Sequence, residues 1–189
     1  MAETPKDSLL NLIQSLSKSE KRQFRLYVNR LGINTDAKFL LLFDVMDKMN
    51  EYDEQKIVDR KITTKQQLSN LKAHLYRQIL ISLRTNPSNQ NNRIILREQI
   101  DFATILYNKG LYKQALKILD KTKQTAIELE EKDIAYEIVE FEKVVESQYI
   151  TRSIDTRADD LIADAKHLGK LNALNSKLSN LSLKLYSMM

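Results

Sequence analysis

The chain of 189 residues contains no cysteine and no tryptophan, and it has few glycines and prolines. Without cysteine, disulfide bonds and zinc sites with thiolate ligands are excluded, and no oxidising compartment is needed. Glycine and proline form many of the turns that join β-strands, and Gly32, Gly110, Gly169, Pro5 and Pro87 are too few for a sheet protein. Leu, Lys, Glu, Gln and Ala, which favour helices, are abundant. The sequence therefore predicts an all-α fold.

Long apolar runs are also missing. The longest one, Phe39–Phe43, is far too short to span a bilayer. In the segment Met1–Leu16 the leucines are interrupted by Asn11 and Gln14, a pattern typical of an amphipathic helix and not of a secretory signal peptide. We therefore expect a cytoplasmic protein that does not bind membranes.

The residue patterns of common catalytic and metal sites are absent as well. The two histidines, His74 and His167, lie in different halves of the chain, and neither has carboxylates at a metal-ligand spacing. The glycines are isolated from one another, so no phosphate-binding loop is present, and no serine lies in a nucleophile-elbow motif. We expect a protein without enzyme activity, cofactor or metal.

The excess of positive charge belongs to the N-terminal half. Residues 1–95 contain 16 Lys and Arg against 10 Asp and Glu, a net charge of +6, whereas residues 96–189 contain 14 against 15, a net charge of −1. The polar segment 86–92 separates the halves, and Pro87 within it disfavours a continuous helix. We expect an N-terminal basic helical region at 1–85, a linker at 86–92 and a second helical region at 93–189.

Apolar residues at intervals of three and four predict the helices of the N-terminal half. A first helix precedes Ser17, which forms a capping box with Glu20 at the start of a second helix. A third helix begins at Asp36, a short one covers 53–59 and a long one begins at Thr64. The long helix has an apolar face made of Leu68, Leu71, Leu75, Ile79 and Leu83. Together these helices predict an N-terminal helical bundle.

The C-terminal half is expected to contain helices over 93–109, 112–130, 133–149, 155–168 and 171–189. Short connections make neighbouring helices antiparallel. The last helix has an apolar face formed by Leu174, Leu178, Leu181 and Leu185, with no later helix in this sequence to cover it. We expect either a fragment of a longer protein or a homodimer that pairs through the helix 171–189.

The sequence between residues 103 and 119 resembles a tetratricopeptide repeat. The family's small, large, turn, aromatic and second small positions are matched in order by Ala103, Leu106, Gly110, Tyr112 and Ala115, and its next large position by Leu119. A divergent second copy lies 43 residues further on, lacks the glycine and has Ala158, Ile162 and Ala165 in its second helix. The resemblance implies a superhelix of helix pairs after the N-terminal region.

The same resemblance implies a function. Residues 17–84 are similar to N-terminal helical regions that precede such repeats in bacterial proteins of uncharacterised function. Repeats of this family present a groove, formed by the first helix of each pair, to a protein or peptide segment. In this chain the groove would include Gln99, Asn108 and Glu142. The expected function is a non-enzymatic scaffold that binds a protein or peptide.

A DNA-binding regulator is the alternative. The helices at 53–59 and from Thr64 have the order of a helix-turn-helix, and the second region would then serve dimerisation or an effector. The recognition helix would present Lys65, Gln66, Gln67 and Asn70 to bases, with Lys72 and Arg77 on phosphates. The connection lacks glycine and the net charge is modest, which favours the scaffold.

An acidic stretch covers residues 128–146. Its carboxylates are Glu128, Glu130, Glu131, Asp133, Glu137, Glu140, Glu142 and Glu146. Charge runs on helices usually face solvent, and Glu128 has the spacing to pair with Lys132. We expect a solvated face here in preference to a binding patch for a basic partner.

Overall fold

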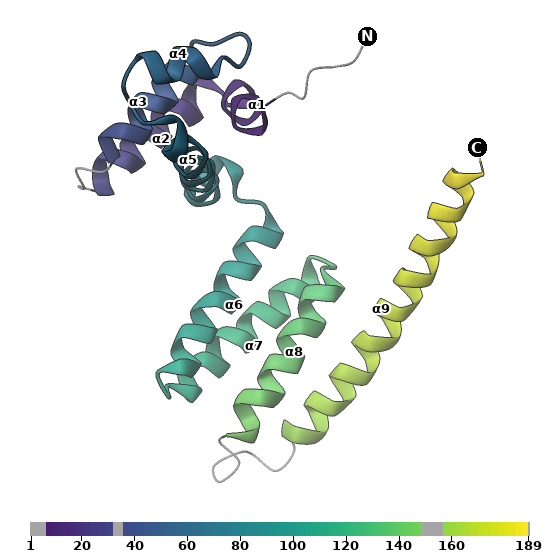
Figure 1. Cartoon of the computed structure of the whole chain (residues 1–189). Helices are drawn as coiled ribbons and strands as arrows, with labels where there is room; N and C mark the ends of the chain where they lie inside the picture. Colours follow the sequence, from purple (N-terminus) through teal and green to yellow (C-terminus); the bar gives the residue numbers. More distant parts are fainter. Residues whose placement is uncertain (1–6, 32–35, 149–156, 189) are drawn as a thin grey trace. The chain divides into compact units, whose positions relative to one another are not determined.

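The computed structural model describes residues 7–31, 36–148 and 157–188. Within these ranges every regular element is a helix and no strand occurs, so the prediction of an all-α fold is confirmed (Figure 1). The chain divides into two compact units, Met1–Gln90 (unit 1) and Asn91–Met189 (unit 2). This division lies within the segment 86–92. None of the described helices is both long and apolar enough to cross a membrane.

Unit 1 is a bundle of helices around one apolar core. Its elements are α1 (Ser8–Ser15), α2 (Lys18–Leu31), α3 (Asp36–Met46), α4 (Glu54–Asp59), α5 (Lys65–Thr85) and the 3₁₀ helix η1 (Pro87–Asn89). The helices α1, α2 and α3 all contact α5. The residues that are fully or almost fully buried include Leu9, Ile13, Phe24, Phe39, Phe43, Leu75 and Ile79. The apolar faces expected from the spacing therefore meet in this core.

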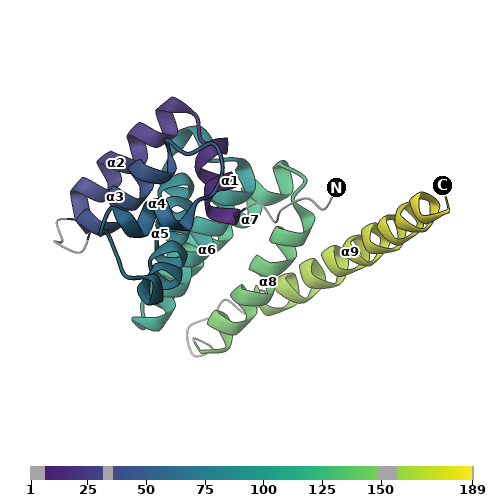
Figure 2. The ribbon, with the colours of Figure 1, turned by 45° about the horizontal axis from the view of Figure 1, so that its top comes forward.

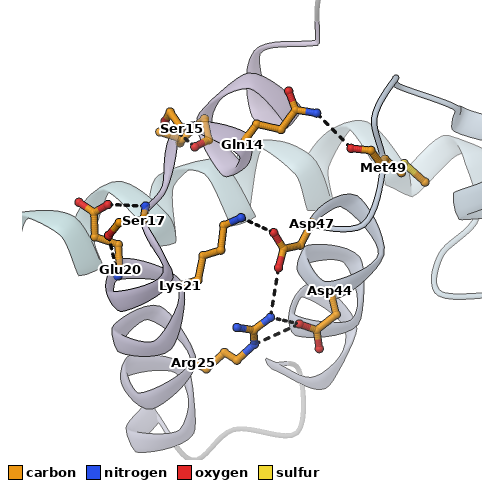
Figure 3. A network of polar contacts seen from close by, with 10 residues as sticks. Gln14, Ser15, Ser17, Glu20, Lys21, Arg25, Asp44, Asp47 and Met49 are labelled. Atoms are coloured by element: carbon orange, nitrogen blue, oxygen red, sulfur yellow. Dashed lines mark hydrogen bonds and ion pairs between the residues drawn. The ribbon is translucent and has the colours of Figure 1, made fainter.

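Side-chain caps define where α1 and α2 begin. The Asp7 carboxylate accepts hydrogen bonds from the backbone N–H groups of Leu9 and Leu10, at 3.1 and 3.0 Å. The backbone N–H of Ser17 donates to Glu20 Oε2 at 2.8 Å, and the backbone N–H of Glu20 donates to Ser17 Oγ at 3.2 Å (Figure 3). The capping box predicted from the sequence is confirmed.

Replacing Ser17 with alanine is expected to lower the free energy of unfolding by about 1 kcal/mol, because the N–H of Glu20 loses its acceptor. Hydrogen bonds from the backbone and side chain of Ser17 lower the pKa of the Glu20 carboxyl. The stability linked to this ionisation is therefore present at neutral pH and lost as the pH falls through the lowered pKa. Urea unfolding at neutral pH measures the loss in the variant, and urea unfolding at a series of lower pH values measures the pH dependence. The control Ser19→Ala keeps the cap, and equal losses in the two variants would contradict the prediction.

Ion pairs also join α2 to α3 near the surface. Lys21 Nζ lies 2.6 Å from Asp47 Oδ1, and the Arg25 guanidinium lies 2.7 Å from Asp44 Oδ1 and 3.4 Å from Asp47 Oδ2 (Figure 3). These side chains are half-buried, and ion pairs near the surface contribute about 1 kcal/mol or less each. The apolar core therefore supplies most of the stability of unit 1.

Unit 2 is a stack of four helices in the part of the chain that is described. They are α6 (Asn92–Asn108), α7 (Tyr112–Glu128), α8 (Lys132–Ser147) and α9 (Arg157–Ser187). Each contacts the next along the chain, and α6 also contacts α8 (Figures 1 and 2). The core includes Leu96, Ala103, Ala115, Leu119, Ile134, Ile138, Val145, Leu161 and Leu168. Ala103 and Ala115 have no exposed surface, which fits a close approach of α6 and α7.

The helix α9 corrects the expectation of two helices over 155–168 and 171–189. It is one continuous helix of 31 residues with Gly169 inside it. A single glycine destabilises a helix by only about 1 kcal/mol. This is too little to break a helix when the segments before and after the glycine both form helix well. A β-carbon at Gly169 would lie 3.5 Å from Tyr136 Cε2, so α8 passes close to this position. The glycine therefore marks a helix contact and not a turn.

Candidate functional site

The turn between α6 and α7 is built around Gly110, which has a positive φ of 73°. The Gly110 N–H donates to the Tyr107 carbonyl and the Leu111 N–H donates to the Leu106 carbonyl, both at 2.9 Å. This pair of bonds is the Schellman motif that ends many helices. The centres of the Tyr107 and Tyr112 rings, on either side of the turn, lie 5.6 Å apart. Two residues of the tetratricopeptide-like pattern thus lie together here: Gly110 forms the turn, and Tyr112 is the first residue of α7.

The turn between α7 and α8 has the same hydrogen bonds without a glycine. The Glu130 N–H donates to the Ile127 carbonyl at 3.0 Å, and the Glu131 N–H donates to the Ala126 carbonyl at 2.9 Å. Glu130 has a φ of 57°, in the left-handed region. A residue with a side chain is disfavoured there by about 1 kcal/mol. Sequence reasoning missed this repeated turn because glutamate gives no sign of a positive φ.

Replacing Glu130 with glycine is therefore expected to raise the free energy of unfolding by about 1 kcal/mol. The reverse change, Gly110→Ala, should lower it by a similar amount; a β-carbon at Gly110 meets nothing within 4 Å, so only the backbone opposes it. Thermal unfolding of both variants measures the effect. The control Lys121→Gly places glycine within α7 and should lose about 1 kcal/mol. A loss in Glu130→Gly as large as in the control would contradict the prediction.

The three predicted groove residues lie in different environments. Gln99 in α6 is half-buried, and Asn108 at the end of α6 is exposed. Glu142 in α8 has no exposed surface. Glu142 is thus placed inside unit 2, away from any surface that a partner could reach. Gln99 and Asn108 stay candidate contact residues.

The buried carboxylate of Glu142 belongs to an ion network that joins α7, α8 and α9. Lys123 Nζ lies 3.0 Å from Glu142 Oε2 and 3.2 Å from Asp164 Oδ2. Arg157 Nη2 lies 3.2 Å from Glu142 Oε1, and Arg157 Nε lies 3.4 Å from Glu146 Oε2. Lys123 and Glu146 are themselves buried, each with 6% of its surface exposed. The network therefore holds the N-terminal part of α9 against α7 and α8.

Burial and charge act against each other in this network. Burial raises the pKa of the Glu142 carboxyl above its usual value, although Lys123 and Arg157 act in the opposite direction. Burial lowers the pKa of the Lys123 ammonium, but hydrogen bonds to Glu142 and Asp164 outweigh it, so the net pKa lies above the usual one. Lys123 is therefore charged at neutral pH and, together with Arg157, compensates the buried Glu142 carboxylate.

This network corrects the expectation of a solvated face for two residues of the acidic stretch, while its other six carboxylates are exposed or half-buried. Glu142 and Glu146 are four residues apart on α8 and both point into the unit. A sequence signal for this existed, because Ile138 and Val145 flank Glu142 at intervals of four and three on the buried face. Lys123 and Arg157 gave no such signal, since their distances to Glu142 depend on the packing of three helices.

The residues of the DNA-binding alternative lie on α5. Five of them are exposed: Lys65, Gln66, Gln67, Asn70 and Arg77. Lys65 Nζ lies 3.5 Å from Glu54 Oε1. Lys72, expected on a phosphate, instead forms an ion pair with Asp7 and lies 4.1 Å from the centre of the Tyr52 ring. The alternative stays a prediction, with Lys72 held by contacts inside unit 1.

The C-terminal part of α9 has an apolar surface that no described residue covers. Asn172 Nδ2 donates to the carbonyl of Lys132, the first residue of α8, at 3.4 Å. Past this point α9 extends beyond α8 (Figures 1 and 2), and every described side chain from 173 onward is exposed. The large apolar side chains among them range from 54% exposed at Leu174 to 84% at Met188. We call residues 173–188 the α9 tail.

Other features offer little chemistry. No group of three or more His, Asp or Glu side chains that could hold a metal ion occurs among the residues that the structure describes. A hollow of about 1110 Å³ in unit 1 lies between the end of α3 and α4, with Lys48, Tyr52, Asp53 and Arg60 among its lining residues. These side chains are exposed or half-buried.

The tetratricopeptide-like pattern is carried by one helix pair. In the divergent second copy, Ala158 is exposed, Ile162 is 60% exposed and Ala165 alone packs on the core. Membership of that family stays a prediction. No protein-family model, no curated protein and no solved structure matches this chain.

Proposed function

We propose that unit 2 is a non-enzymatic scaffold of stacked helices that binds a protein or peptide segment. The observation that carries the proposal is the uncovered apolar surface of the α9 tail. Moving one leucine or methionine side chain from water into an interface is worth about 1.5–3 kcal/mol, and contiguous apolar surface on a folded protein marks an interaction site. The absence of cysteine fits a cytoplasmic location for this role.

The tail is presented by a well-anchored helix. The N-terminal part of α9 buries Leu161 and Leu168 in the core of unit 2, and Arg157 joins it to the ion network. Binding residues on a rigid element lose less freedom when a partner binds. Asn108, exposed at the end of α6, supplies a separate candidate contact.

Site-specific photo-crosslinking in the host cell tests this proposal. A photoreactive amino acid is placed in the full chain at position 178 in the α9 tail, at position 108, or at position 121 on the exposed side of α7. We expect a discrete protein adduct from position 178 and none from position 121. Absence of adducts at 178 and 108, or equal adducts at all three positions, would contradict a binding role.

A further inference from the structure

The apolar residues at the C-terminal end of α9 have the spacing of a coiled coil. Intervals of three and four alternate without exception along Leu171, Leu174, Leu178, Leu181, Leu185 and Met188, which we call the seam. These are the a and d positions of a heptad, whose side chains insert between those of a second helix. Leu183 and Tyr186 lie outside the seam. Before residue 183 every large apolar side chain of the tail belongs to this stripe of two residues in seven, which is narrower than the apolar face of a helix lying on a membrane.

The seam lies on the side of α9 that faces away from α8. The residues on the packed side are Leu161, Ala165, Leu168 and Asn172, at intervals of four, three and four. With 3.6 residues per turn, the seam is displaced from that side by about 140°, or about two fifths of a turn. A helix bound to the seam would therefore add a layer to the stack without displacing α8.

A row of lysines borders one edge of the seam. Lys170, Lys177 and Lys184 recur at every seventh residue, each directly before a seam leucine, and so occupy the g position. All three are exposed, and no ion pair within the described ranges engages them. The sequence from 165 to 189 contains no Asp or Glu. The edge of the seam thus carries positive charge without compensation.

A second copy of the chain would leave these lysines unmatched. In a parallel pair, each g position faces an e position of the other helix, and here the e positions hold Asn175 and Ser182. In an antiparallel pair, g faces g and lysine meets lysine. Neither orientation supplies a carboxylate, so the charge pattern favours a different chain.

We propose that the seam of α9 is the docking site for an amphipathic helix of another protein, with apolar residues at matching spacing and a row of Asp or Glu along the edge that meets Lys170, Lys177 and Lys184. This inference rests on the proposed function and names the chemistry of the partner. Opposite charges on facing helices select the partner and its orientation, while the apolar seam supplies most of the affinity.

Two synthetic peptides test the inference. Both contain three heptads with leucine at every a and d position; one has Glu at every e and g position and the other has Lys. Titrated by fluorescence anisotropy against the full chain at low salt, the acidic peptide should bind at least about tenfold more tightly, because each lysine contact changes from attraction to repulsion. Added salt should reduce this ratio.

Charge reversal makes the test specific to this edge. The triple variant Lys170→Glu, Lys177→Glu and Lys184→Glu should reverse the preference and bind the basic peptide more tightly. Replacing three exposed lysines elsewhere in unit 2 with Glu, at positions 109, 117 and 121, gives the same change of net charge and should leave the preference unchanged. Leu178→Asp should abolish binding of both peptides, because a charge then lies within the seam.

Other outcomes assign the seam differently. If neither peptide binds, or both bind equally, the acidic-helix inference is overturned, while a crosslinked adduct from position 178 would still support protein binding. A concentration-dependent dimer in sedimentation velocity, abolished by Leu178→Asp, would assign the seam to a second copy. Binding to vesicles of anionic lipid with the same dependence would assign it to a membrane surface. Each of these two results overturns the inference.

Discussion

Replacing Lys123 with methionine is expected to lower the free energy of unfolding of unit 2 by about 3 kcal/mol or more. The methionine has a similar shape, but it leaves the fully buried Glu142 carboxylate with Arg157 as its only close cation among the described residues. Removing one partner of a buried pair costs more than the pair itself contributes, because the remaining charge is not hydrated and, with Arg157 alone beside it, is only partly compensated. Burial already raises the pKa of Glu142, so loss of Lys123 should raise it further.

Urea unfolding followed by far-UV circular dichroism measures this loss. The double variant Lys123→Met, Glu142→Leu should recover most of it, since an apolar pair of similar volume replaces the buried ions. The control Lys121→Met changes an exposed lysine on the same helix and should stay within about 0.5 kcal/mol of the parent. If the losses of the single variants Lys123→Met and Glu142→Leu simply add in the double variant, the pair is not coupled and the prediction is wrong.

In unit 1 the largest effect is expected from Phe43→Ala, a loss of about 3–5 kcal/mol. Phe43 has no exposed surface, its ring lies 4.7 Å from the ring of Phe24, and the Arg25 guanidinium lies 5.1 Å from its centre. Alanine would lose the transfer free energy of the ring and leave a cavity between α2 and α3. A domain has only about 5–15 kcal/mol of stability in total, so this variant should be close to unfolded at physiological temperature.

Leu41→Ala is the matched control for that variant, because Leu41 lies two residues earlier on α3 and is 53% exposed. Its loss should be less than about 1 kcal/mol. Thermal unfolding of both proteins, with the melting temperature as the readout, compares them directly. Equal shifts in melting temperature would show that α3 does not bury the face that the structure gives it.

Features decided within one or two helical turns could be predicted from the sequence. The capping box of Ser17 and Glu20 needs only residues three apart, and the buried positions Leu68, Leu75 and Ile79 of α5 follow from intervals of four and seven. Their physical cause is local, so the order of the residues was sufficient. The cap of α4 is local as well, since the Asp53 side chain accepts a hydrogen bond from the Lys56 N–H.

Features that depend on contacts between helices could not be predicted. Gly169 reads as a break, yet the helix continues through it because α8 supports that stretch. Glu130 takes a positive φ because α7 and α8 must reverse direction within three residues. The burial of Glu142 depends on Lys123 and Arg157, which approach it from two other helices. For the proposed binding surface, the spacing of the leucines could be seen in the sequence, whereas their exposure required the structure.

The continuity of α9 decides how its far end moves. A helix of 31 residues is about 46 Å long and stiff, whereas a flexible chain of the same number of residues would have a typical end-to-end distance of about 30 Å and no fixed direction. The C-terminal end of α9 therefore keeps a fixed direction relative to the rest of the helix. Its base is held against α7 and α8 by the ion network around Arg157 and by Leu161 and Leu168 in the core. A small change of tilt at this base would displace the leucines of the seam by several times as much, so the direction in which the proposed docking surface points depends on how firmly the base is held.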